Sequence, residues 1–279
     1  MNITLQKSTN KEVELKLSSQ PTVQNKFDAE FSRGNYEVLM SKLEGLADWK
    51  IESLGVRVIN DEYWDTTDWS VQRIGGAFRV RLFGDTISVD VKRPTGKNKS
   101  SEGLFVRDEQ SIPLSVEGLT DAQRTDFLNI RKETIPEIAA FAFQPVFQLF
   151  NTRRVFLLSK GEARIELSID SFHYRTPARD QQTDTFGELE FEALNEEGTA
   201  ALLEVANTMN IGDIPGIAFS TMSKYERGVR ELRVNEPEWL KTSARWCKSN
   251  VGTLTLAVIA VLSIGFGLIG IIIGALSLF

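Results

Sequence analysis

The 279-residue sequence has a single cysteine and a single histidine. One cysteine, Cys247, cannot form a disulfide framework within the chain or a cysteine-based zinc site. One histidine, His173, excludes a metal site built from several histidines, and we expect its side chain to pack or to lie on the surface. A serine hydrolase triad is not expected either, because no nucleophile elbow is present. Chemistry in this chain must therefore rest on other polar groups.

An apolar stretch near the N-terminus is also absent, because residues 1–30 are polar and predict no signal peptide. By contrast, residues 251–279 contain no charged residue. About 20 apolar residues cross the hydrocarbon core of a bilayer, so we expect one transmembrane helix here, acting as a tail anchor. A buried core helix is the alternative. The segment is preceded by Lys241, Arg245 and Lys248, and the positive-inside rule then places the soluble domain in the cytoplasm.

The sequence before this segment is long enough for one large domain over residues 1–232, followed by a linker over 233–250. A GxxxG motif, Gly270 to Gly274, lies in the apolar segment and allows homodimer packing in a membrane.

The formal net charge is −6, which taken alone argues against a polyanionic partner. No nucleic acid partner is expected.

Short segments of the domain alternate between apolar and charged residues, which is the period of a β-strand. They lie at 12–17, 78–82, 87–92, 105–109, 164–170 and 188–192, and further strands are expected at 51–64 and 145–159. We expect helices at Asn35–Trp49, Thr120–Lys132, Glu197–Asn210 and about 223–232, and polar loops at Thr95–Gly103 and Thr176–Thr185. Strands with a few helices indicate an α+β protein dominated by antiparallel sheet.

The alternating pattern fits two arrangements. In an ordinary half-buried sheet, the charged faces of the strands meet water. In a closed barrel covered by helices, the apolar faces point outward and the charged faces line the interior. Periodicity alone does not distinguish them.

Several motifs follow one another in a fixed order along the chain. They are Glu12-x-Glu14-x-Lys16, Tyr63-Trp64-Asp65-Thr66-Thr67-Asp68, Phe78-Arg79-Val80-Arg81, Val89-Asp90-Val91-Lys92, Arg107-x-Glu109, Arg153, the run 164–170, Glu188-Leu189-Glu190 and Ser223-Lys224-Tyr225. Over residues 10 to 230 this order resembles the CYTH family of triphosphate tunnel metalloenzymes, closest to its bacterial inorganic triphosphatases. Thr67 departs from the usual proline, and Asp90 stands where the family often has threonine. The resemblance implies a closed antiparallel β-tunnel of about eight strands with covering helices.

The resemblance also implies roles for the polar residues. Cations that would bind a triphosphate are Lys16, Arg79, Arg81, Lys92, Arg107, Arg153 and Lys224. Carboxylates that would hold a hard ion, Mg²⁺ or Mn²⁺, are Glu12, Glu14, Glu109, Asp170, Glu188 and Glu190. The residues expected to act in catalysis are Glu12, Glu14, Lys16, Lys92 and Lys224. Asp90 is expected to weaken polyanion binding or to pair with a nearby arginine, and Glu166, Glu192 and Arg164 are expected to be solvated or supporting residues near the tunnel mouths.

The function implied is metal-dependent hydrolysis of a triphosphate, first of all of inorganic tripolyphosphate to pyrophosphate and phosphate. Thiamine triphosphatase and adenylate cyclase activities of the same family are the enzymatic alternatives. The alternative without catalysis is a membrane-tethered sensor that binds polyphosphate or a nucleotide.

Overall fold

The computed structural model describes residues 8–19, 33–95, 104–114, 134–136, 142–176, 181–210, 214, 217–232 and 234. The elements reported below belong to one unit, Met1–Leu232, and the rest of the chain forms a second unit, Arg233–Phe279. The predicted transmembrane segment 251–279, the linker 233–250 apart from Val234, and the predicted helix Thr120–Lys132 lie outside the described residues. Among the described helices, none has the length and apolar character needed to cross a membrane.

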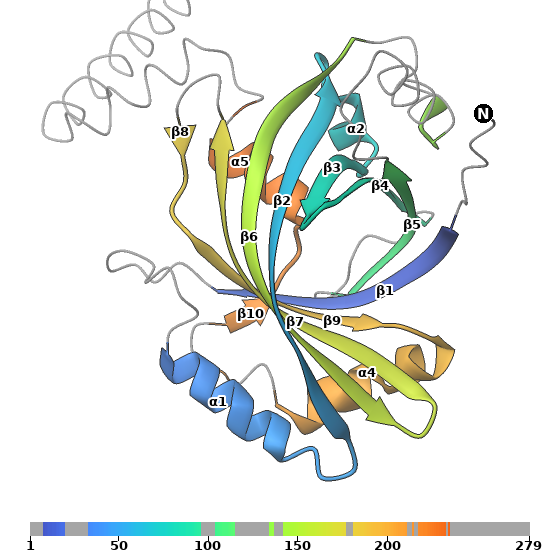
Figure 1. The fold of residues 1–279 in the computed structure, drawn as a ribbon, viewed down its shortest axis with the longest axis vertical. Coiled ribbons are helices and arrows are strands. Elements are labelled where there is room, and N and C mark those ends of the chain that lie inside the picture. Colours follow the sequence, from blue (N-terminus) through green and yellow to red (C-terminus); the bar gives the residue numbers. More distant parts are fainter. Residues whose placement is uncertain are drawn as a thin grey trace, which may run out of the picture. The chain divides into compact units, whose positions relative to one another are not determined.

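Eight antiparallel strands form a closed barrel (Figure 1). In the order of their pairing they are β1 (Ser8–Ser19), β5 (Leu104–Leu114), β4 (Thr86–Pro94), β3 (Ala77–Phe83), β2 (Lys50–Thr66), β6 (Phe143–Lys160), β7 (Ala163–Thr176) and β9 (Phe186–Ala193). The barrel closes because β9 pairs with both β7 and β1. Two short strands, β8 (Gln181–Gln182) and β10 (Ile217–Phe219), extend the sheet beside β7 and β1. The predicted closed antiparallel barrel is confirmed.

The longest pairing in the barrel joins β2 and β6, which have 17 and 18 residues. Its register shifts between Ser53 and Gly55 and between Tyr63 and Trp64. Such irregularities bend and twist a strand, which helps a long ribbon to follow a curved wall. Gly55 has a φ of +88°, a conformation that glycine adopts without steric cost.

Two helices, α1 (Arg33–Glu44) and α4 (Glu196–Thr208), cover the outer face of part of the barrel (Figure 1). Asn195 begins α4, and its side chain accepts a hydrogen bond from the Gly198 backbone N–H at 2.8 Å. The core between helices and sheet includes Leu39 and Leu43 of α1, Leu202 and Val205 of α4, Leu15 and Leu17 of β1, and Leu189 and Phe191 of β9. The apolar face of each strand therefore points outward. Because side chains alternate along a strand, the charged faces point into the barrel.

A smaller core covers the outer face of β3, β4 and β5. It contains Phe78, Val89, Val91 and Ile112 together with Val71 of α2 (Ser70–Arg73) and Ile135. The helices predicted at Asn35–Trp49, Glu197–Asn210 and about 223–232 are present as α1, α4 and α5 (Lys224–Leu232). The single turn of α2 was not predicted, and β8 interrupts the segment predicted as a polar loop over Thr176–Thr185.

Candidate functional site

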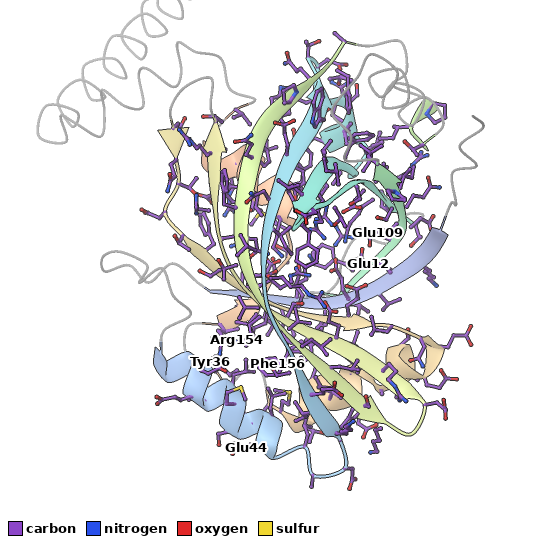
Figure 2. The ribbon with its side chains drawn as sticks, viewed as in Figure 1. Glu12, Tyr36, Glu44, Glu109, Arg154 and Phe156 are labelled. Carbon is purple, nitrogen blue, oxygen red and sulfur yellow. The ribbon has the colours of Figure 1, made fainter. Side chains whose placement is uncertain are left out.

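A polar cavity of about 220 Å³ lies inside the barrel. All eight strands and α5 contribute to its wall, through Glu12, Lys16, Arg57, Tyr63, Ala77, Arg79, Arg81, Asp90, Lys92, Arg107, Glu109, Arg153, Glu166, Glu190, Glu192, Ser223, Lys224 and Tyr225. Figure 2 shows Glu12 and Glu109 in the space enclosed by the strands, whereas Tyr36 and Arg154 lie beside α1. Arg153 lines the cavity, as predicted, whereas Arg154 lies outside it and donates a hydrogen bond to the Tyr36 hydroxyl at 2.7 Å.

The carboxylates of β7 and β9 converge on three cations. The Lys224 Nζ lies 2.8 Å from both Asp170 Oδ2 and Glu188 Oε1, and 2.6 Å from Glu190 Oε1. Lys16 also contacts Glu190 and lies 3.2 Å from Glu14 Oε1. The Arg153 guanidinium donates to both oxygens of Asp170, at 2.7 and 2.6 Å, and reaches Glu190 as well. The strand register explains this meeting, because Asp170 pairs with Arg153 on one side and with Glu188 on the other.

A second group of charges links β1, β4 and β5. Lys92 contacts Glu12, and its Nζ lies 3.4 Å from Glu109 Oε2. Arg107, which is opposite Glu12 in the β1–β5 register, contacts Glu14 and has its Nε 3.7 Å from Glu12 Oε2. These residues were all predicted from the family motifs.

A third group contains a residue that the sequence analysis missed. Asp61 is buried on β2 and accepts hydrogen bonds from Arg81 Nε and Nη2 at 2.8 and 2.9 Å. Arg79 lies between Asp61 and Asp90, 3.3 Å from one carboxylate and 3.0 Å from the other. Asp90 thus pairs with a neighbouring arginine, one of its two predicted outcomes. Asp61 has no counterpart among the quoted motifs; the one available signal was its position two residues before Tyr63, which places both side chains on the same face of the expected strand.

The ion pairs keep the buried groups charged. Burial alone would raise the pKa of Glu12, but the charges of Lys92, Arg107 and Lys16 outweigh it and lower the pKa to about 2. Burial likewise would raise the pKa of Asp90, but the charges of Arg79 and Arg81 outweigh it and lower the pKa to about 2. The pKa of Lys16 is raised in spite of burial, because Glu190, Glu188 and Glu12 surround it. Acids and bases in the barrel therefore neutralise one another near neutral pH.

Glu192 differs from the other carboxylates. It lines the cavity on β9, and no lysine or arginine of the described residues lies within ion-pair distance of it. Burial raises the pKa of Glu192 to about 7; the charge of Lys92 opposes the rise, and Glu12, Glu109 and Glu190 add to it. Glu166 also lines the cavity, 3.7 Å from Arg57 Nη1. Glu166 and Glu192 were expected to be solvated or supporting residues near the tunnel mouths; both line the cavity, because they alternate with Glu190 and Ser168 along the same strands, and their roles stay a prediction.

The acidic residues fit a hard divalent ion by their chemistry. They present only carboxylate oxygens, which are the ligands that Mg²⁺ and Mn²⁺ prefer. Three buried carboxylate oxygens, Glu12 Oε2, Glu14 Oε1 and Glu188 Oε2, have no hydrogen-bond partner in the described part of the chain, although Glu14 Oε1 contacts Arg107 and Lys16 as ion pairs. No cluster of three or more His, Cys, Asp or Glu side chains within the described residues is already arranged around one point. The lysines and arginines hold these carboxylates, so an ion would require some of them to exchange partners.

One end of the barrel is filled by aromatic side chains beneath α5. Tyr225 stacks on Tyr63 and Phe147, with ring centroids 5.3 and 5.7 Å apart. Gly228 packs directly against the Phe147 ring. Any larger residue would clash there, because an added Cβ would lie 2.5 Å from that ring. The Tyr174 hydroxyl donates to the Lys224 carbonyl at 2.7 Å, which fixes the start of the helix.

Asp65 ties this end together and has a role that sequence reasoning did not assign. Its buried carboxylate accepts a hydrogen bond from the Tyr225 hydroxyl and from the backbone N–H groups of Thr66, Val71 and Gln72. The last two belong to α2, whose first turn Asp65 thus caps. One side chain therefore connects β2 to α2 and to the helix that carries Lys224.

The predicted site residues fall into two shells. All the predicted phosphate-binding cations line the cavity, as do Glu12, Glu109 and Glu190. The remaining predicted metal ligands, Glu14, Asp170 and Glu188, are buried behind them in contact with those cations. His173 lies on the other face of β7 and stacks on Phe150, 5.2 Å between ring centroids.

One family model and several solved structures are similar to this chain. The sequence model of the CYTH domain matches residues 10–214. No curated protein matches the chain. Among solved structures, HpAC1 from Hippeastrum, a proposed adenylyl cyclase reported to have a dominant triphosphatase activity, is 18% identical with a TM-score of 0.48, over 78% of this chain and 94% of that one. PH1819 from Pyrococcus horikoshii is 14% identical with a TM-score of 0.44, over 78% and 98%. The RNA triphosphatase Pct1 of S. pombe is 14% identical with a TM-score of 0.32, over 76% and 86%.

The bond between Tyr225 and Asp65 should be measurable as stability. Tyr225→Phe removes the hydroxyl and leaves a buried carboxylate with one donor fewer, which we expect to lower the free energy of unfolding by about 1–3 kcal/mol. Tyr36→Phe is the matched control, because its hydroxyl meets Arg154 at the surface, and a loss below about 0.5 kcal/mol is expected there. Urea unfolding followed by circular dichroism measures both. Equal losses for the two variants would contradict the role given to Asp65.

Glu192 should make stability depend on pH near neutrality. Its ordinary pKa of 4.5 is raised to about 7, so between these values the folded chain keeps a proton that the unfolded chain releases. The free energy of unfolding contributed by this group is therefore greatest below pH 4.5 and falls as the pH rises toward 7. Glu192→Gln should reduce this decline by roughly 1–3 kcal/mol. Urea unfolding at pH 5, 6 and 7 measures how the free energy of unfolding changes with pH. The exposed Glu44→Gln is the control and should keep the wild-type pH dependence. If Glu192→Gln also keeps the wild-type pH dependence, the assignment is wrong.

Proposed function

Since the chain belongs to the CYTH domain family, we propose that it hydrolyses a triphosphate with the help of a divalent metal ion. Inorganic tripolyphosphate, split into pyrophosphate and phosphate, is the substrate that we propose first. The observation that carries the proposal is the convergence of Lys16, Arg79, Arg81, Lys92, Arg107, Arg153 and Lys224 on one cavity.

The anion would be bound by cations that now hold carboxylates. A triphosphate carries about four to five negative charges near neutral pH, since the second pKa of a phosphate is about 6. Arginine can bind phosphate oxygens through two parallel hydrogen bonds, and lysine acts as a point charge. Arg153, Lys16 and Lys224 meet at Glu190, so a phosphate placed there would contact all three at once.

The same exchange would free carboxylates for a metal ion. The metal ligands that we propose are the carboxylates released from these lysines and arginines, namely Glu12, Glu14, Glu109, Asp170, Glu188 and Glu190. When bound, a divalent ion would supply charge neutralisation and an activated water for attack on the terminal phosphorus. The cations of the cavity would stabilise the charge that develops on the leaving pyrophosphate. The aromatic cluster under α5 would exclude bulk water from that end.

One feature favours an organic triphosphate as the second candidate. Phe83 has an exposed ring (41% exposed) beside the cationic wall, where a thiamine or adenine ring could stack. Inside the cavity itself, Tyr63 and Tyr225 are almost fully buried and stack on each other. Among the described residues that line the cavity, these two aromatic groups therefore offer no free ring face, which supports the inorganic substrate.

We also propose that residues 251–279 anchor the chain in a membrane as a single tail helix, with the soluble domain in the cytoplasm. The support is compositional: the segment lacks charged residues, and Lys241, Arg245 and Lys248 precede it. The GxxxG motif from Gly270 to Gly274 supports a homodimer packed through this helix.

A phosphate-release assay tests the proposed activity. The full chain is incubated with tripolyphosphate, ATP or thiamine triphosphate, each with Mg²⁺, Mn²⁺ or a chelator. We expect metal-dependent release that is fastest with tripolyphosphate. Glu12→Gln should lower the rate by about 10²-fold or more, because it removes a carboxylate at the charge cluster, whereas the exposed Glu44→Gln should not change it.

Each other outcome has a distinct meaning. Release that persists in chelator would contradict a metal-dependent reaction. Formation of a cyclic nucleotide from ATP without free phosphate would favour the cyclase. Binding of tripolyphosphate with no product of either kind would favour the sensor.

A further inference from the structure

Two further cavities adjoin the tunnel cavity and differ in charge. One, of about 170 Å³, shares Arg57, Arg81 and Arg153 with the tunnel cavity, and its other lining residues are Ile59, Phe83, Thr86 and Ser88. The other, of about 700 Å³, shares Glu12, Glu109 and Glu192 with it and is also lined by Glu196 and one cation, Lys11. The first is built on β2, β3, β4 and β6, and the second on β1, β5, β9 and the start of α4. We call them the basic recess and the acidic recess.

Both recesses lie at the same end of the barrel. Ser88 of the basic recess and Ser111 of the acidic recess each donate a hydrogen bond to Asp90 Oδ1, at 3.0 and 2.7 Å. The aromatic cluster under α5 lies at the other end, because Tyr63 and Asp65 follow Arg57 along β2. In the closed order of strands, β1 and β2 are on opposite sides. A substrate that projects from the tunnel at this end therefore meets a basic wall and an acidic wall.

Of the three arginines in the basic recess, Arg57 makes the weakest ion pair. Arg81 and Arg153 each donate two hydrogen bonds to one buried aspartate. Arg57 has one carboxylate neighbour among the described residues, Glu166, at 3.7 Å, and its side chain is 33% exposed. Its guanidinium also lies 6.0 Å from the centre of the Phe83 ring. A guanidinium held this loosely retains most of its hydrogen-bonding capacity for a ligand.

The size and polarity of the recess identify the ligand. At about 170 Å³ it is smaller than the 300–1,000 Å³ typical of pockets that enclose a drug-sized organic molecule. Its donors are guanidinium groups, which match phosphate geometry. The acidic recess on the facing wall would repel the same anion. We propose that the basic recess binds a fourth phosphate group through Arg57, so that the tunnel also accepts linear phosphate chains longer than tripolyphosphate and binds them more tightly; this rests on the proposed function of the tunnel.

Calorimetry with two anions tests this assignment. The full chain and its variants are titrated with inorganic tripolyphosphate and inorganic tetrapolyphosphate, in a chelator buffer and in Mg²⁺. The wild type should bind tetrapolyphosphate about tenfold more tightly than tripolyphosphate, as expected for one added charge-assisted contact. Arg57→Gln should remove this preference, so that the ratio of the two affinities falls to about one whatever the change in tripolyphosphate affinity itself, and Arg57→Lys should restore part of the preference.

Arg154→Gln is the matched control, because Arg154 follows the cavity-facing Arg153 on the same strand but points outward to Tyr36. It should keep the tenfold preference. A wild type without preference, or an Arg57→Gln variant that retains it, would overturn the assignment while leaving the proposed function intact. Binding of neither anion in either buffer would refute the proposed function itself. If ATP binds more tightly than tetrapolyphosphate and only Phe83→Ala weakens it, the recess binds an organic ring and the proposal is wrong.

Discussion

The structure depends on the mutual neutralisation of acids and bases inside a closed barrel. Moving an ion from water into a protein interior costs several kcal/mol even after the surroundings relax, and a good partner is needed to offset that cost. Here Glu190 meets Lys16, Lys224 and Arg153, Glu12 meets Lys92, and Asp61 holds both Arg79 and Arg81. The apolar faces of the same strands pack outward under α1 and α4. Because side chains alternate along a strand, forming this outer core also turns the charged faces inward.

This arrangement suits a ligand that carries charges of its own. An anion of high charge density can replace carboxylates at the lysines and arginines, and a divalent ion can replace the lysines and arginines at the carboxylates. Under the proposed function, substrate and metal would therefore favour each other's binding. The aromatic cluster under α5 gives the barrel one filled end, and Asp65 joins that cluster to the short helix α2 and to the helix bearing Lys224.

Much of the barrel could be predicted because its strands alternate strictly. In Glu12-Val13-Glu14-Leu15-Lys16-Leu17, both faces are legible, and the order of motifs settled which face points inward. Asp61 and Arg57 were missed because their strand reads less regularly, with a register shift near Ser53 and Gly55. That Glu192 lines the cavity could not be predicted, because position along a strand does not reveal how deeply a tilted barrel encloses a side chain. The partners of each charge, such as Asp90 with Arg79, depend on registers between strands that no single segment encodes.

The most direct test of the central claim is a crystal structure of the chain with tripolyphosphate and Mn²⁺, in which anomalous scattering locates the metal. In that structure, phosphate oxygens should contact Lys16, Lys224 and Arg153, and manganese should lie on carboxylates released from these cations. An anion bound outside the barrel, with the contacts of Glu190 to its three cations unchanged, would contradict the proposed exchange of partners.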